Sequence, residues 1–154
     1  MHPIYICDIK RVDMNPFLQK LKLADQTPVL LINSPEEVKL LFADRMVHEH
    51  HVVLKKYAFI LAFIFTLEQA KSLVGDLVSA YEPGGCLWVA FPKSASGKYK
   101  SDITDDALWS VFVPYDFEPV AEVFLKNDWH VIRFHHLDEI KAKIKKDKNT
   151  EKRR

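Results

Sequence analysis

The longest apolar run in the chain spans Tyr57 to Leu67 and reads YAFILAFIFTL. Its 11 residues are too few to cross a bilayer as a helix, which takes about 20, so we expect no membrane span. Apolar side chains occupy both alternating faces of the run, which is typical of a central parallel strand covered by helices on each side. The sequence therefore predicts a strand over Tyr57–Phe65 at the centre of an α/β domain.

Helix-start signals follow the predicted strands. Ser34 is placed as an N-cap with Pro35 at the first helical position, and Thr66 forms a capping box with Gln69. Thr104 precedes two carboxylates and caps a third helix. The predicted order is strand 27–33, a helix from 34, a short strand or loop within 46–56, strand 57–65, helix 66–81, strand 86–91 and a helix from 104.

Two further strands, within Pro119–Leu125 and Trp129–His135, are joined by only three residues. A connection this short allows only an antiparallel hairpin. The alternation before it predicts a parallel sheet. The fold class that we predict is therefore a three-layer, Rossmann-like α/β fold with a mostly parallel sheet and a C-terminal antiparallel hairpin.

Charge is distributed unevenly along the chain. Residues 141–154 carry eight basic and two acidic side chains, whereas residues 1–140 hold 14 basic and 19 acidic ones. An acidic body is a poor binder of duplex DNA. We predict one α/β domain over 1–140, with 1–26 as an extension of uncertain structure, and a disordered basic tail over 141–154.

The chain has two cysteines, Cys7 and Cys86, and no secretory signal pattern at its start. This pattern favours a reducing, cytoplasmic location. Cys7 lies in an apolar segment and Cys86 begins a predicted buried strand, where a thiol behaves as a small hydrophobe. Neither is expected to act as a nucleophile.

The turn Pro83-Gly84-Gly85 and the strand after it resemble the turn and fifth strand of S-adenosylmethionine-dependent methyltransferases. More closely, the segment Leu87–Lys93, Ser101-Asp102, and Trp129 with Arg133-Phe134 resemble the bacterial family named domain of unknown function 3052. The resemblance covers roughly 27–134. It implies a truncated methyltransferase-like fold for which no activity is established.

The loop after the first strand, Ile32–Glu36, contains no glycine. A cofactor loop of the usual kind needs glycine, because only a residue without Cβ turns tightly and approaches a nucleoside closely. We therefore predict no cofactor; S-adenosylmethionine would have to bind by an unusual route.

Ligands of open α/β sheets bind at the carboxyl ends of the parallel strands, so the candidate site lies there. Lysine and serine side chains after the strand 86–91 suit a phosphate or carboxylate, with the helix N-terminus at Thr104 adding to the attraction. The alternative is a solvated loop whose lysines only maintain solubility. The candidate ligand-binding residues are Asn33, Ser34, Thr66, Pro92, Lys93, Ser94, Ser96, Lys98, Asp102 and Trp129.

The sequence contains little that indicates metal binding, nucleotide hydrolysis or acyl transfer. The segment His48-Glu49-His50-His51 lacks metal-site spacing, because His48 and His50 share one face of a strand while His51 points away. It is interpreted as a solvated connection, and no metal site is predicted. There is no G-x-x-x-x-G-K-[ST] loop for nucleotide hydrolysis and no G-x-S-x-G elbow for acyl transfer.

Two hypotheses from different classes remain. The favoured one is a non-enzymatic module that binds a small molecule or a protein on a degenerate methyltransferase-like sheet. The alternative is a divergent S-adenosylmethionine-dependent methyltransferase or other transferase; the sequence leaves open whether the chain is an enzyme. A third hypothesis is homo-oligomerisation through the edge hairpin, Pro119–His135.

Overall fold

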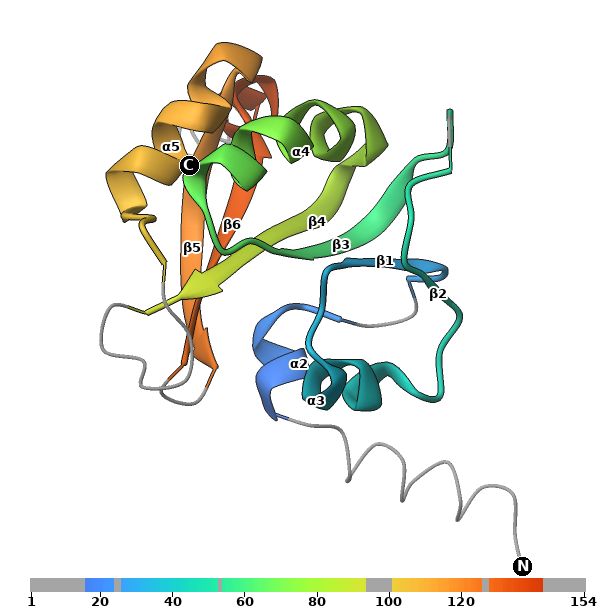
Figure 1. Ribbon diagram of the computed structural model, residues 1–154. Helices are drawn as coiled ribbons and strands as arrows, with labels where there is room; N and C mark the ends of the chain where they lie inside the picture. Colours follow the sequence, from blue (N-terminus) through green and yellow to red (C-terminus); the bar gives the residue numbers. More distant parts are fainter. Residues whose placement is uncertain (1–15, 24–25, 53, 94–100, 126–127, 143–154) are drawn as a thin grey trace, which may run out of the picture.

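The computed structural model describes residues 16–23, 26–52, 54–93, 101–125 and 128–142. A six-stranded sheet separates two helical layers, with α4 and α5 on one face and α2 and α3 on the other (Figure 1). The helices are α2 (Pro16–Lys20), α3 (Glu36–Lys39), α4 (Leu67–Ala80) and α5 (Asp105–Phe112). The strands are β1 (Val29–Ile32), β2 (Val47–His48), β3 (Tyr57–Phe63), β4 (Tyr81–Pro92), β5 (Phe117–Leu125) and β6 (Trp129–His136).

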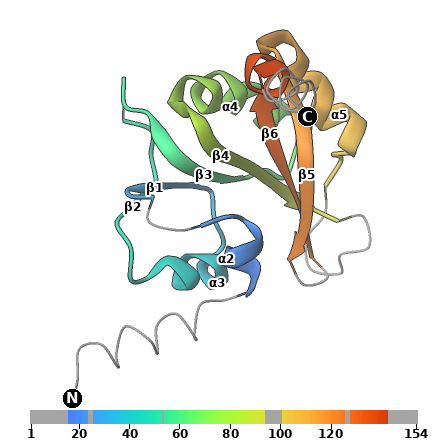
Figure 2. The same cartoon turned by 180° about the vertical axis from the view of Figure 1, so that it is seen from behind.

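The strand order is β2-β1-β3-β4-β6-β5. The first four strands in this order pair in parallel, and β6 pairs antiparallel with both β4 and β5. Figure 2 shows β5 at one edge of the sheet and β2 near the other. The predicted class, a mostly parallel sheet with a C-terminal antiparallel hairpin, is confirmed.

The central strand β3 is buried on both faces, as its apolar run predicts. Phe59, Leu61 and Phe63 pack in the cluster on the α2 and α3 side. The alternate residues Ile60 and Ala62 pack in the cluster under α4 and α5. The period of two thus supplies a separate hydrophobic core to each helical layer.

The first described residues belong to this core. Phe17, Leu18, Leu21 and Leu23 pack on the sheet, and the Trp88 indole Nε1 donates a 2.9 Å hydrogen bond to the Leu21 carbonyl. Part of the extension predicted over 1–26 therefore covers one face of the sheet. At the other end, residues 141–142 continue a helical segment that begins at 137, and the rest of the predicted basic tail lies outside the described residues.

Two of the three predicted helix caps are confirmed. The Thr66 hydroxyl accepts from Gln69 N at 3.1 Å, and the Thr104 hydroxyl accepts from Ala107 N at 3.2 Å. The prediction for Ser34 is wrong, because α3 begins at Glu36 with Pro35 at the N-cap position and no side-chain cap. The short helix continues into a 3-10 turn, Leu40–Phe42, in which Leu40 is exposed.

The Pro83-Gly84-Gly85 turn forms an irregularity inside β4. Tyr57 pairs with Tyr81 and Phe59 pairs with Cys86, so several residues of β4 bulge out of register against β3. Gly84 has φ +87°, and a Cβ on Gly85 would stand 2.7 Å from the Ala58 carbonyl oxygen. The two glycines are therefore required by the left-handed turn and by the close approach of two backbones.

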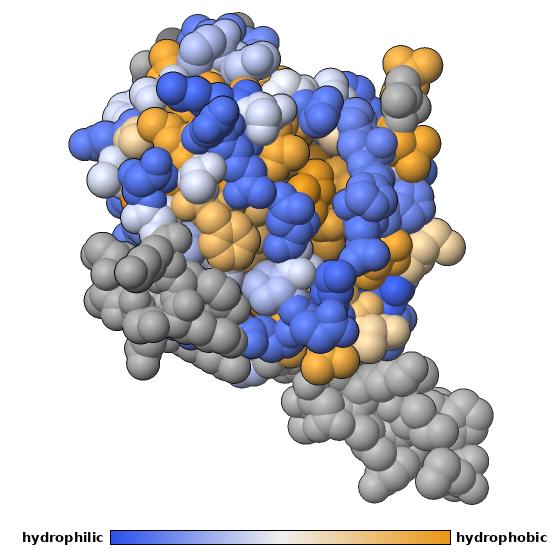
Figure 3. Space-filling model, in the orientation of Figure 1, coloured by the Kyte–Doolittle hydropathy of each residue, from blue (hydrophilic) through white to orange (hydrophobic). Residues whose placement is uncertain are grey.

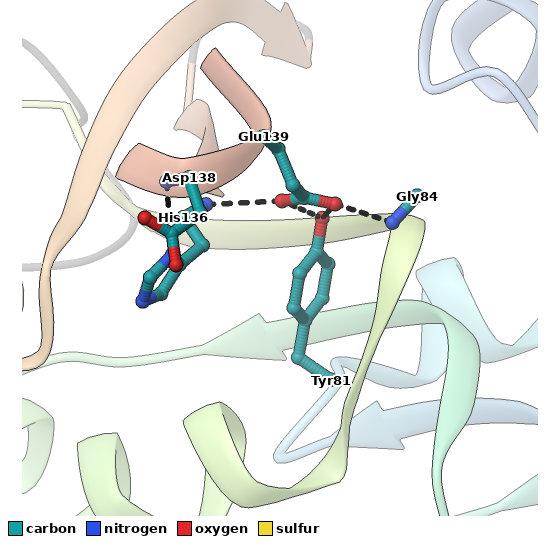
Figure 4. Close-up of polar contacts among 5 residues, drawn as sticks. All are labelled: Tyr81, Gly84, His136, Asp138 and Glu139. Carbon is teal, nitrogen blue, oxygen red and sulfur yellow. Dashed lines mark hydrogen bonds and ion pairs between the residues drawn. The ribbon is translucent and has the colours of Figure 1, made fainter. Parts of the chain in front are cut away.

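Glu139 binds this turn to the end of β6 (Figure 4). Its carboxylate accepts from the Tyr81 hydroxyl at 2.8 Å, from His136 N at 3.1 Å and from Gly84 N. Burial disfavours the ionised form of Glu139, but these three donors outweigh it and lower its pKa below the ordinary value. Burial and the neighbouring carboxylate raise the pKa of Tyr81, which remains a hydrogen-bond donor.

The surface seen in Figure 3 is mostly hydrophilic, with separate hydrophobic areas between the polar side chains. Exposed apolar side chains on the α5 and β5 side include Trp109, Val120 and Phe124. Among the described helices, none combines the length and the hydropathy that crossing a membrane requires.

We expect Gly85→Ala to destabilise the fold by about 1–3 kcal/mol, because the new methyl group overlaps backbone atoms that cannot rotate away. Gly75→Ala is the matched control. Gly75 lies inside α4, and the nearest atom to an added Cβ is Tyr115 Oη at 3.8 Å, so helix propensity should raise stability by up to about 1 kcal/mol. Urea unfolding measures the stability of both variants. Equal stability of the two variants would contradict the close contact.

Glu139→Gln should lower the free energy of unfolding at pH 7 by about 1 kcal/mol, because a charged acceptor of three hydrogen bonds becomes neutral. Since folding lowers the pKa of Glu139, its contribution is complete above the ordinary value of 4.5 and is lost as the pH falls further through the folded pKa. The difference between parent and variant should therefore shrink below pH 4.5.

Unfolding curves at several pH values measure this difference. Glu82→Gln is the control, because Glu82 is an exposed carboxylate in the same turn. A difference that persists unchanged in acid, or an equal effect of Glu82→Gln, would show that the Glu139 charge is not responsible.

Candidate functional site

The candidate site follows from the order in which the chain forms the sheet. From β1 the chain moves outward to β2 and then returns to place β3 on the opposite side of β1. The connections leaving β1 and β3 therefore diverge, and a crevice is expected outside their carboxyl ends. Asn33 and Ser34 follow β1 at this point, and Thr66 follows β3.

Asn33 and Ser34 have unusual local structure. Asn33 has φ +55°, in the left-handed region that favours glycine and that asparagine tolerates better than most residues. Ser34 is only 9% exposed, and its hydroxyl is a buried group for which the described residues provide no hydrogen-bond partner. Asparagine thus makes the tight turn that is expected only of glycine. The turn leaves the buried Ser34 hydroxyl at the place where the connections leaving β1 and β3 diverge, which is the switch point of the sheet.

Glu49 was not among the predicted site residues. It follows β2, whose pairing of His48 with Leu30 brings it to the same edge of the sheet as Ser34. Its carboxylate binds the Lys39 ammonium of α3 at 2.7 Å, and this hydrogen bond, followed by the Lys39 charge, lowers the pKa of Glu49. Both side chains are about half exposed, at 51% and 41%. The sequence supplied the acidic residue but not the strand pairing that places it.

Two of the predicted site residues hold the start of α4. The Thr66 hydroxyl is the N-cap of α4, and Asp102 Oδ1 accepts from Leu67 N at 3.0 Å across 35 residues. An anionic side chain at a helix N-terminus is favoured by the helix dipole. In this structure Thr66 and Asp102 therefore serve α4, and the site that they were predicted to form stays a prediction.

Pro92, Lys93 and Trp129 lie on the β4 and β6 side of the same edge, where Pro92 pairs with Trp129. The Lys93 ammonium stands 4.8 Å from the Phe124 ring centroid, and its backbone N–H donates to the Asp128 carbonyl. Trp129 is 1% exposed and packs edge-to-face on Phe63 and Phe65. The remaining candidates, Ser94, Ser96 and Lys98, lie outside the described residues.

His48 of the histidine segment has a hydrogen-bond partner, and Cys86 is buried. His48 is part of β2, and its Nδ1 is 2.6 Å from the buried Tyr57 hydroxyl, so the interpretation of this residue as a solvated connection is wrong. Cys86 is a free buried thiol in β4, and burial raises its pKa. A thiol in this state is a weak nucleophile.

A second polar cluster joins three elements on the α5 side of the sheet. His130 of β6 is 8% exposed, and its Nδ1 lies 3.1 Å from Asp105 Oδ1 of α5. Its Nε2 lies 2.9 Å from Glu122 Oε2 of β5. No local sequence motif marks these residues, because they are separated by 17 and 8 positions and meet only through tertiary packing.

The chain is similar in structure to solved methyltransferases. NodS, an N-methyltransferase from Bradyrhizobium japonicum WM9, matches with a TM-score of 0.50 and 11% identity over 84% of this chain and 97% of NodS. A putative type 11 methyltransferase from Sulfolobus solfataricus matches with a TM-score of 0.49 and 10% identity over 80% of this chain and 79% of its own. The ribosomal protein L11 methylase from Lactobacillus delbrueckii subsp. bulgaricus gives 0.45 and 16% over 71% of this chain, which spans 58% of that protein.

No family model matches the chain, and no curated protein matches it either. At 11% identity the likeness to NodS establishes the fold alone. The sheet is therefore methyltransferase-like, as predicted, and membership of domain of unknown function 3052 stays a prediction.

Removing the Thr66 hydroxyl and removing the Ser34 hydroxyl should affect the free energy of unfolding differently. Thr66→Ala removes an N-cap and should cost about 1 kcal/mol. Ser34→Ala removes a buried hydroxyl that has no partner in the described part of the chain, so the free energy of unfolding should stay constant or rise. Chemical denaturation of the ligand-free protein compares the variants. A loss in Ser34→Ala as large as that in Thr66→Ala would mean that the Ser34 hydroxyl already has a structural partner.

Proposed function

We propose that the chain binds S-adenosylmethionine, or a nucleoside of the same chemistry, at the carboxyl ends of β1 and β3 and is a divergent methyltransferase. The observation that carries the proposal is the buried Ser34 hydroxyl, which has no partner among the described residues and lies at the switch point of the sheet. A buried polar group without a partner costs free energy, and a bound ligand would repay that cost.

The residues at this point fit such a ligand. Asn33, in the left-handed conformation, turns the chain as a glycine would and contributes an exposed amide. Ser34 supplies a hydroxyl that donates and accepts. Asn33 can therefore make the tight turn that brings the backbone close to a nucleoside. The lack of glycine in this loop does not argue against a nucleoside site.

Glu49 would accept hydrogen bonds from ribose hydroxyls. It stands at the end of the strand next to β1, 15 positions after Ser34, and an acidic residue about 20 positions after the first loop is the usual ribose ligand of doubly wound sheets. Lys39 now binds this carboxylate, but exposed ion pairs contribute little, so the exchange of partners is inexpensive.

S-Adenosylmethionine, when bound, supplies an electrophilic methyl group on a sulfonium. NodS is named as an N-methyltransferase, which supports this ligand class over others that the fold accommodates. A binding module without transfer is the second candidate, and the use of Thr66 and Asp102 as structural caps favours it. Release of S-adenosylhomocysteine in the presence of an acceptor separates the two candidates.

Thermal unfolding with and without saturating S-adenosylmethionine and S-adenosylhomocysteine tests the proposal. A ligand at 100 times its dissociation constant adds about 2.7 kcal/mol, which for this chain length corresponds to a rise in Tm of about 5–11 °C. Ser34→Ala and Glu49→Gln should each reduce the rise, because each removes a hydrogen-bonding group from the site.

Ser79→Ala is the matched control. Its hydroxyl bonds the Asp76 carbonyl in the last turn of α4, at the opposite edge of the sheet. The Ser79→Ala variant should show the same ligand-induced rise in Tm as the parent protein. No rise for the parent protein with either ligand, or an equal reduction in all three variants, would reject the proposed site.

A further inference from the structure

The second polar cluster has the composition of a metal site. Asp105, Glu122 and His130 each offer one ligand atom, and these atoms lie within 4.8 Å of one another. They come from the first turn of α5, from β5 and from β6. Imidazole nitrogen and carboxylate oxygen are donors that zinc accepts together in proteins.

The imidazole of His130 is held in place before any ion arrives. The Phe124 ring stacks on it with centroids 4.6 Å apart and an interplanar angle of 15°, and Phe91 lies 5.1 Å away. The two carboxylates, by contrast, are 60% and 59% exposed. A rigid nitrogen ligand and two adjustable oxygen ligands can therefore close around an ion that enters from solvent.

We propose that Asp105, Glu122 and His130 bind one divalent zinc ion that fastens the first turn of α5 to the terminal hairpin. Zinc binds nitrogen at about 2.0–2.1 Å and carboxylate oxygen at about 2.0–2.2 Å, so ligand atoms around one ion stand about 3.4 Å apart. The 3.1 and 2.9 Å separations run to opposite ring nitrogens, so the ion takes one nitrogen and the carboxylate on the other nitrogen must turn toward it. One ligand atom from each residue already lies within 4.8 Å of the other two, and both carboxylates are exposed enough to turn.

One ring nitrogen binds the ion. The two ring nitrogens point away from each other, so a carboxylate cannot accept the N–H of one nitrogen and also bind an ion held by the other. The carboxylate on the second nitrogen therefore gives up its hydrogen bond to the ring when it binds the ion, and its bond to zinc offsets that loss. The positive ion also offsets the repulsion between two carboxylates that share one imidazole.

Zinc binding to the full chain, measured by isothermal titration calorimetry and by the zinc-induced change in Tm, tests the proposal. We expect one site in the parent protein. Glu122→Gln and Asp105→Asn should each weaken it by more than about 10-fold, and His130→Asn should abolish it. Ligand-free circular dichroism and Tm show whether each variant remains folded.

The double variant His50→Ala and His51→Ala is the control, because it removes two neighbouring histidines after β2, a competing source of imidazole ligands. It should bind zinc as the parent does. Loss of the site in this double variant would overturn the proposal, as would a parent protein that binds no zinc or folded Glu122→Gln and Asp105→Asn variants that both keep the parental affinity. Cobalt in place of zinc gives a second readout, since its visible spectrum should report nitrogen and oxygen ligands in the parent and change in His130→Asn.

Discussion

Burial of β3 on both faces is the constraint on which the rest of the structure depends. A strand that presents Phe59, Leu61 and Phe63 to one side and Ile60 and Ala62 to the other is stable only between two helical layers. It must also have a neighbour on each side, which β1 and β4 provide in parallel. Three parallel strands then end at one edge, and the path of the chain through β2 makes the junction of β1 and β3 the point where the connections diverge.

Polar groups at both edges of this sheet can be compared by their hydrogen-bond partners. At the amino edge, Glu139 accepts from the Tyr81 hydroxyl and from two backbone N–H groups, and the irregular turn of β4 is thereby satisfied. At the carboxyl edge, Thr66 and Asp102 cap α4, but the buried Ser34 hydroxyl is left over among the described residues. Protein structures rarely leave such a group unpaired without a reason, and the Ser34 hydroxyl lies where the connections leaving β1 and β3 diverge.

The sequence predicts those structural features that depend on residues close together in the chain. The apolar run of β3, the caps at Thr66 and Thr104 and the short hairpin connection are local signals, and the structure has each of them. Ser34 is not a cap, because α3 starts at Glu36 with Pro35 in the N-cap position. The left-handed conformation of Asn33 is likewise not signalled by its neighbours in the sequence. Glu49 and the cluster around His130 depend on strand register and on the packing of α5, and a single sequence does not contain that information.

The two proposed sites act independently because the sheet separates them. Adjacent strands are about 4.8 Å apart, and β4 lies between β3 and β6, so the junction of β1 and β3 is roughly 12–17 Å from the side chains on β6 and β5. At this distance no residue belongs to both sites, so perturbations of stability at the two sites should add to within a few tenths of a kcal/mol. An ion at His130 therefore cannot share a ligand atom with Ser34, and its effect falls on α5 and the hairpin. A zinc ion in this chain would thus contribute to the stability of α5 and the hairpin, and not to the binding of a nucleoside by Ser34.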